Sequence, residues 1–210
     1  WMAFRSARRL HAVRAARGDA GAIPRESVWL GTLVMQALLL ALAWATARSY
    51  GSDIFEVPLV GLRELLIGAG ALAACVAVRA LLHAVRSEEE RRALAVYAIA
   101  PRTSREWGLW TATVLVASVA EEAAYRGVGV AILWYWLGAP TVAVLLCATA
   151  FTLGHWVQGA KSGVAIFFIA LVMHGVVRLT GTLFIAIAVH AIYDFIAGYL
   201  IARDAPDIAA

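Results

Sequence analysis

The sequence contains very little lysine and cysteine. Lys161 is the only lysine, so the formal net charge of +4 is carried almost wholly by arginine. Arginines that flank apolar segments are topology signals, so this charge does not indicate a nucleic-acid surface, and no nucleic-acid partner is expected. The two cysteines, Cys75 and Cys147, lie within apolar runs. This placement argues against a disulfide framework, and neither cysteine has a neighbouring base that would make it a nucleophile.

Polar residues are scarce along most of the chain. Hydrophobic residues make up 62% of the 210 residues and the mean hydropathy is +0.78, whereas soluble domains are about 45 to 50% apolar. Such a chain is typical of an integral protein of the lipid bilayer, and several spans of about 20 residues leave no room for a separate soluble domain. We predict one all-α domain over residues 1–210, a polytopic helical bundle of about six transmembrane helices plus amphipathic surface segments.

Six apolar runs mark the predicted spans. They cover residues 28–47, 58–82, 107–132, 141–157, 164–178 and 182–202. A six-span topology puts most basic residues on one side, in the arm at 1–26, the linker at 83–106, the loop at Lys161 and the tail at Arg203. Both termini are therefore expected in the cytoplasm. The arm is a candidate amphipathic surface helix, and the arginine-rich composition suggests a bacterial inner membrane.

The run at 107–132 carries charges that are costly in a bilayer. An ionisable group at mid-bilayer depth costs about 2.5 to 3.5 kcal/mol on insertion scales, so Glu121, Glu122 and Arg126 are predicted to have a function. Glu122 and Arg126 are one helical turn apart and are expected to form a salt bridge. Glu121 points about 100° away around the helix, so its carboxylate needs a partner from another helix.

Further polar groups are expected at the depth of Glu121. With a rise of about 1.5 Å per residue, Glu121, His155 and His190 lie about 13 to 21 Å from the same edge of the membrane. His190 and Asp194 are one turn apart, so the carboxylate can act with the imidazole or orient it. A single buried histidine is more often a packing residue than a catalyst. Several titratable groups converging from three apolar helices favour a functional site.

The residue types limit the chemistry of this site. No serine or cysteine lies within helical reach of the histidines in the same span, which argues against a nucleophilic triad. Carboxylate and imidazole together can activate water as a general base, while donors opposite them stabilise an oxyanion. The alternative is a divalent metal such as zinc, held by His155, His190 and Glu121. The sequence has no HExxH motif, so we favour a metal-free mechanism that requires no cofactor.

Three motifs carry a resemblance to a known family. They are Glu121-Glu122-Ala-Ala-Tyr-Arg126, Phe151-Thr-Leu-Gly-His155 and His190-Ala-Ile-Tyr-Asp194. In this order they resemble the EExxxR, FxxxH and HxxxN or HxxxD pattern of the CPBP intramembrane proteases. That family, also called Abi, comprises CAAX prenyl proteases, bacteriocin-processing enzymes and myxosortase-like members. The resemblance covers roughly residues 105–200, which we take as the catalytic core.

The resemblance implies a role for each motif residue. Glu121 and His155 would activate the attacking water, Glu122 and Arg126 would form a structural pair, and His190 with Asp194 would hold the oxyanion. Asp194 departs from the best-described members, which have Asn there, because an ionised carboxylate cannot donate a hydrogen bond. It is then protonated, orients His190 or favours a metal. The expected substrate is a membrane-anchored peptide or a carboxy-terminal tail, cut near the bilayer.

Two other functions are compatible with buried polar groups. A non-catalytic membrane scaffold or bacteriocin-immunity protein would bind a peptide in the same cavity without cutting it. A proton or metal transporter would use the same groups as a relay, but the sequence shows no internal repeat and no helix interrupted by proline at its midpoint. We leave His174 outside the predicted site. Gln158, three residues after His155, is a candidate substrate contact near the cytoplasmic edge.

Overall fold

The computed structural model describes residues 25–55, 60–92 and 94–204, and within these ranges the regular structure is helical throughout. The helices are α2 (Arg25–Ser49), α3 (Leu62–Ala84), α4 (Glu88–Arg92), α5 (Ala95–Ala98), α6 (Ser104–Glu121), the π-helix η2 (Glu122–Gly129), α7 (Val130–Leu137), α8 (Pro140–Gly154), the 3₁₀ turn η3 (Trp156–Gln158), α9 (Ala160–Thr180) and α10 (Leu183–Asp204). The predicted all-α bundle is confirmed.

Four of the described helices are long and apolar enough to cross a bilayer, namely α2, α3, α9 and α10. The segments α6, η2 and α7 follow one another without a break, and α8 is a shorter apolar helix. Each of the six predicted apolar runs therefore contains a helix in its described part, and the protein is an integral membrane protein. The predicted amphipathic arm lies outside the described residues, apart from Arg25 and Glu26 at the start of α2.

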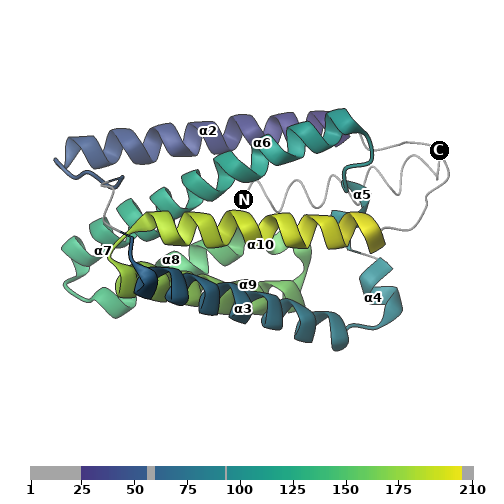
Figure 1. Ribbon diagram of the computed structural model, residues 1–210. Coiled ribbons are helices and arrows are strands. Elements are labelled where there is room, and N and C mark those ends of the chain that lie inside the picture. Colours follow the sequence, from purple (N-terminus) through teal and green to yellow (C-terminus); the bar gives the residue numbers. More distant parts are fainter. Residues whose placement is uncertain (1–24, 56–59, 93, 205–210) are drawn as a thin grey trace.

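The helices form two groups joined by α10 (Figure 1). In one group α2 runs alongside α6, and in the other α3 packs against α9, while α10 contacts both groups. Small residues allow these close approaches. A Cβ atom added at Gly68 of α3 would lie 2.9 Å from Ile185 of α10, so the absence of a side chain there sets the spacing of the two helices. Cys75 and Cys147 are free, buried packing residues.

Two tight turns connect the later helices. Gly138 and Gly181 end α7 and α9 with φ angles of 63° and 70°. Their backbone N–H groups donate to Trp134 O and Val177 O at 2.9 and 2.8 Å, which closes each helix with a left-handed C-cap. Pro140 then begins α8, where its missing N–H costs no helical hydrogen bond.

Most of the described basic residues lie at one end of the bundle, whereas Arg48, Arg63 and Arg178 lie at the other end. Arg25 at the start of α2 pairs with Glu106 at 2.8 Å, and Lys161 at the start of α9 pairs with Glu90 of α4 at 2.7 Å. Figure 1 shows α4, α5 and the carboxy-terminal end of α10 at this same end. The amino-terminal end of α2, the linker and the loop before α9 therefore share one face of the membrane protein.

Candidate active site

The two adjacent glutamates lie where α6 changes into the π-helix η2. Glu121 is the last residue of α6 and Glu122 the first of η2. A π-helix has hydrogen bonds of the i to i+5 type, and such turns occur frequently at functional sites. Gly129 permits this backbone, because a Cβ atom added there would lie 2.6 Å from the carbonyl oxygen of Ala124, five residues earlier. The sequence analysis treated this segment as a regular α-helix and missed the π-helix. Gly129 is the residue in the sequence that could have indicated it.

The predicted salt bridge between Glu122 and Arg126 is confirmed. Arg126 Nη1 lies 3.1 Å from Glu122 Oε1, and the two side chains are 1% and 0% exposed. The guanidinium also lies 4.3 Å from the ring centroid of Phe151 in α8, which is a cation–π contact. The pair therefore neutralises two charges inside the bundle and fixes α8 against η2.

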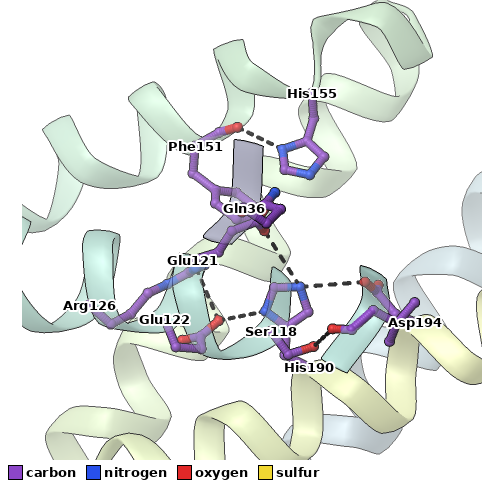
Figure 2. A network of polar contacts seen from close by, with 10 residues as sticks. Gln36, Ser118, Glu121, Glu122, Arg126, Phe151, His155, His190 and Asp194 are labelled. Carbon is purple, nitrogen blue, oxygen red and sulfur yellow. Dashed lines mark hydrogen bonds and ion pairs between the residues drawn. The ribbon is translucent and has the colours of Figure 1, made fainter. Parts of the chain in front are cut away.

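His190 of α10 connects the first and third motifs (Figure 2). Its Nδ1 atom lies 2.7 Å from Glu122 Oε1, the same oxygen that Arg126 contacts. Because an ionised carboxylate can only accept, the Nδ1–H group donates to it. The Nε2 atom lies 3.7 Å from Glu121 Oε2 and 3.6 Å from Asp194 Oδ2. Both distances exceed a hydrogen bond, so Nε2 is left available for another partner.

Glu121 receives its hydrogen bond from the first described helix. Gln36 Nε2 of α2 donates to Glu121 Oε1 at 2.6 Å. The prediction that Glu121 needs a partner from another helix is thus confirmed, and the sequence analysis missed which residue supplies it. Gln36 is the single amide side chain in the apolar run at 28–47, and that was the signal available.

His155 follows the end of α8 as its C-cap residue. Its Nδ1 atom lies 2.9 Å from the carbonyl oxygen of Phe151, so Nδ1 carries the proton and Nε2 has a free lone pair. The ring centroids of Phe151 and His155 are 4.5 Å apart and the rings are tilted by 35°, so the two side chains pack against each other. Within the described residues His155 makes no hydrogen bond or ion pair with Glu121. The two predicted base residues therefore come from different segments, the end of α6 and the C-cap of α8, without a direct contact between them.

His174 and Gln158 lie apart from this cluster. His174 of α9 is buried, and its Nε2 atom has no hydrogen-bond partner in the part of the chain that the structure describes. Gln158 lines a cavity of about 80 Å³ together with Arg79, Arg86 and Tyr193. Tyr193, which lies within the third motif, is the residue that the cavity and this motif share.

The residues predicted as metal ligands do not form a ligand set in this structure. Among the described residues, no group of three or more His, Cys, Asp or Glu side chains is arranged to hold a metal ion. The Nδ1 atoms of His155 and His190 are each directed at an oxygen of the protein, Phe151 O and Glu122 Oε1.

A comparison with protein families places this cluster in a known group. Residues 103–196 match the model of the family described as type II CAAX prenyl endopeptidase, Rce1-like. This segment of the chain is therefore similar to that family. The Rce1-like segment contains all three motifs and confirms the predicted resemblance to CAAX-type intramembrane proteases, whereas Gln36 lies outside it. No curated protein and no solved structure matches the chain.

Proposed function

We propose that this protein is an intramembrane endopeptidase that hydrolyses a peptide bond in a membrane-anchored peptide or carboxy-terminal tail. The observation that supports this most strongly is the approach of Glu121 to the free Nε2 atom of His190 at 3.7 Å, within the Rce1-like segment. A buried carboxylate and a buried imidazole donor face each other from different helices. That arrangement offers a base for water on one side and a donor for an oxyanion on the other.

The proposed reaction assigns one proton movement to each group. Glu121 takes a proton from the water molecule, with the free lone pair of His155 Nε2 as a second acceptor, and the hydroxide oxygen forms a bond to the scissile carbonyl carbon. The resulting oxyanion accepts a hydrogen bond from Nε2–H of His190 in its doubly protonated form. The proton held by Glu121 then passes to the leaving nitrogen as the C–N bond breaks. No metal or other cofactor takes part.

The neighbouring carboxylates hold His190 in place for this role. Glu122 accepts from Nδ1–H at 2.7 Å and is itself fixed by Arg126. Asp194 interacts with His190 more weakly than Glu122 does, because its oxygen lies 3.6 Å from Nε2 and its side chain is 35% exposed. We therefore assign the orientation of His190 to Glu122, and to Asp194 a weaker charge interaction with Nε2.

The setting of the reaction follows from the charge distribution. Most of the described arginines, together with Lys161, lie at the end of the bundle that carries α4 and α5, and only Arg48, Arg63 and Arg178 among the described basic residues lie at the other end. The positive-inside rule then puts this end, and with it both termini, in the cytoplasm of a bacterial inner membrane. The cavity at Gln158 opens beside the third motif and offers cationic groups to an approaching tail.

The experiment that tests this function compares the carboxy-terminal peptides of membrane proteins by mass spectrometry. Cells carry the wild type, Glu121→Ala, His155→Ala or the control Glu89→Gln, which changes an exposed carboxylate of the linker. We expect tails that are cut with the wild type and the control but stay uncut with the other two variants, at equal protein levels in the membrane. Tails cut normally by Glu121→Ala would overturn the proposal. If the protein still performed its cellular function with Glu121→Gln although no tail was cut, this result would instead support the peptide-binding scaffold.

A further inference from the structure

Gln36 contributes to the site although it lies in α2, outside the Rce1-like segment. Its amide nitrogen donates to Glu121 Oε1 at 2.6 Å. Its amide oxygen is buried and has no hydrogen-bond partner in the described part of the chain. A buried carbonyl without a partner is unfavourable, so an apolar side chain would suit this position better if packing alone mattered. Figure 2 shows the Gln36 side chain reaching the Glu121 carboxyl group from its own helix.

The helix that carries Gln36 is held in register along α6. Arg25 pairs with Glu106 at 2.8 Å, and Thr113 Oγ1 donates to the carbonyl oxygen of Trp29 at 3.3 Å. In these two contacts and in the one between Gln36 and Glu121, the residue numbers increase in the same direction along both helices. The helices α2 and α6 therefore run parallel (Figure 1). A parallel helix fixed at three levels places the Gln36 amide at a defined height beside the carboxylate.

A primary amide is suited to a carboxyl group that changes its protonation state. The N–H group donates to an ionised carboxylate, and the carbonyl oxygen of the same amide can accept from a protonated one. Both atoms lie on one planar group, so a single side chain can meet both forms. The unpartnered oxygen of Gln36 then has a partner at the stage of the reaction when Glu121 carries a proton.

We propose that Gln36 is a positioning residue of the active site, whose N–H holds ionised Glu121 in place and whose carbonyl accepts from Glu121 once it is protonated. This inference rests on the proposed function, in which Glu121 takes its proton from the attacking water. The O–H bond of water breaks, the proton moves to Glu121, and the new carboxyl O–H donates to Gln36 until the proton passes to the leaving nitrogen. The active site is thus incomplete without the first described helix.

The first test measures the coupling between the two side chains without using activity. The Tm of the detergent-solubilised full chain is measured for the wild type, Gln36→Met, Glu121→Ala and the double variant. We expect the Tm loss of the double variant to be smaller than the sum of the two single losses, because both changes remove the same hydrogen bond. A parallel cycle with Thr32→Val, which removes a hydroxyl one turn away on α2, should be additive. Additive losses for Gln36 and Glu121 would overturn the inference.

The second test separates positioning from substrate contact and from packing. It uses the tail identified by the mass-spectrometric comparison as a synthetic peptide. Gln36→Met, and Gln36→Asn with an amide about 1.5 Å shorter in reach, should lower kcat by roughly tenfold or more with KM within twofold, while Thr32→Val changes neither. A raised KM at unchanged kcat, or no change at all, would overturn the positioning role. Absence of any tail cut by the wild type would overturn the proposed function itself, whatever the outcome of the Tm cycle.

Discussion

The Nδ1 atom of His190 and the Oε1 atom of Glu122 lie 2.7 Å apart, although 68 residues separate them in the chain. Arg126 contacts the same oxygen at 3.1 Å. One carboxylate oxygen therefore joins a guanidinium and an imidazole inside the bundle. Glu122 therefore has two roles. It neutralises the buried charge of Arg126, and it fixes the imidazole ring of His190, which faces Glu121.

Glu122→Gln should destabilise the protein strongly. It leaves Arg126 buried without its counter-charge, and breaking one partner of a buried pair typically costs about 3 to 5 kcal/mol. Thermal unfolding in detergent measures the loss. The double variant Glu122→Gln with Arg126→Met removes both charges and should recover much of the stability, but not the cleavage activity, because the neutral amide at position 122 no longer stabilises the doubly protonated form of His190. Recovery of activity together with stability would contradict this assignment of Glu122.

Asp194→Asn should have a much smaller effect than Glu122→Gln. The contact of Asp194 with His190 is long and the Asp194 side chain is partly exposed, so the pair contributes little. We expect the variant to keep its cleavage rate within about tenfold and its Tm nearly unchanged, measured beside His190→Asn as the inactive reference. A loss as large as that of His190→Asn would show that the negative charge of Asp194 is required.

Gly129→Ala should disturb the π-helix. The added methyl group would lie 2.6 Å from the Ala124 carbonyl oxygen, which cannot move without changing the wide turn. We expect a cost of about 1 to 3 kcal/mol together with reduced cleavage. Gly108→Ala in α6 is the matched control, because nothing lies within 4 Å of its added Cβ atom, and it should be neutral or stabilising by up to about 1 kcal/mol. Equal Tm values for the two variants would argue against the π-helix.

Removal of divalent metals should leave the cleavage rate unchanged. In the proposed reaction Glu121 and His155 activate the water by themselves. The purified protein is assayed before and after treatment with EDTA and 1,10-phenanthroline, with zinc added back as the control. Loss of activity on chelation with recovery on zinc would show that catalysis requires a metal and would overturn the metal-free mechanism.

The ion pair between Glu90 and Lys161 predicts a pH-dependent attachment of the linker to α9. The hydrogen bond from Lys161, with that of the Ser87 backbone, lowers the pKa of Glu90 below its ordinary value of 4.5. A lowered folded-state pKa contributes stability above the ordinary value, and this contribution is lost as the pH falls through the lowered one. The Tm difference between the wild type and Lys161→Met should therefore be small at pH 7, vanish once the pH has fallen below the lowered pKa of Glu90, and shrink in high salt. A difference that grows on acidification would contradict the pairing.

Much of the cluster followed from helical spacing and from the cost of burying charge. One turn separates Glu122 from Arg126, and that distance alone predicted their salt bridge. The depth of Glu121 and His190 along their helices predicted that they meet, and their side chains are 3.7 Å apart. Both arguments rest on a fixed rise per residue, which a regular helix provides irrespective of its neighbours.

The remaining contacts depend on how the helices rotate and pair. The hydrogen bond between Gln36 and Glu121 requires α2 to lie parallel to α6, and neither helix has a pattern that specifies its neighbour. The contact of His190 with Glu122, rather than with Asp194 on its own helix, depends on the angle between α10 and η2. These contacts depend on tertiary packing. The periodicity of a single sequence does not predict which helices are neighbours or how they are rotated.

The π-helix η2 changes the angular position of the residues that follow it around the helix axis. The side chains of α7 therefore do not continue the faces of α6. The helix α6 before it holds Glu121 among buried residues, whereas α7 after it has no buried residue and ends in the exposed Trp134, Tyr135 and Trp136. A helical wheel drawn through the whole segment would therefore assign the wrong face to everything after Gly129. Transplanting the EExxxR motif into a straight α-helix would carry over the residues but lose their angular relation to the rest of the membrane protein.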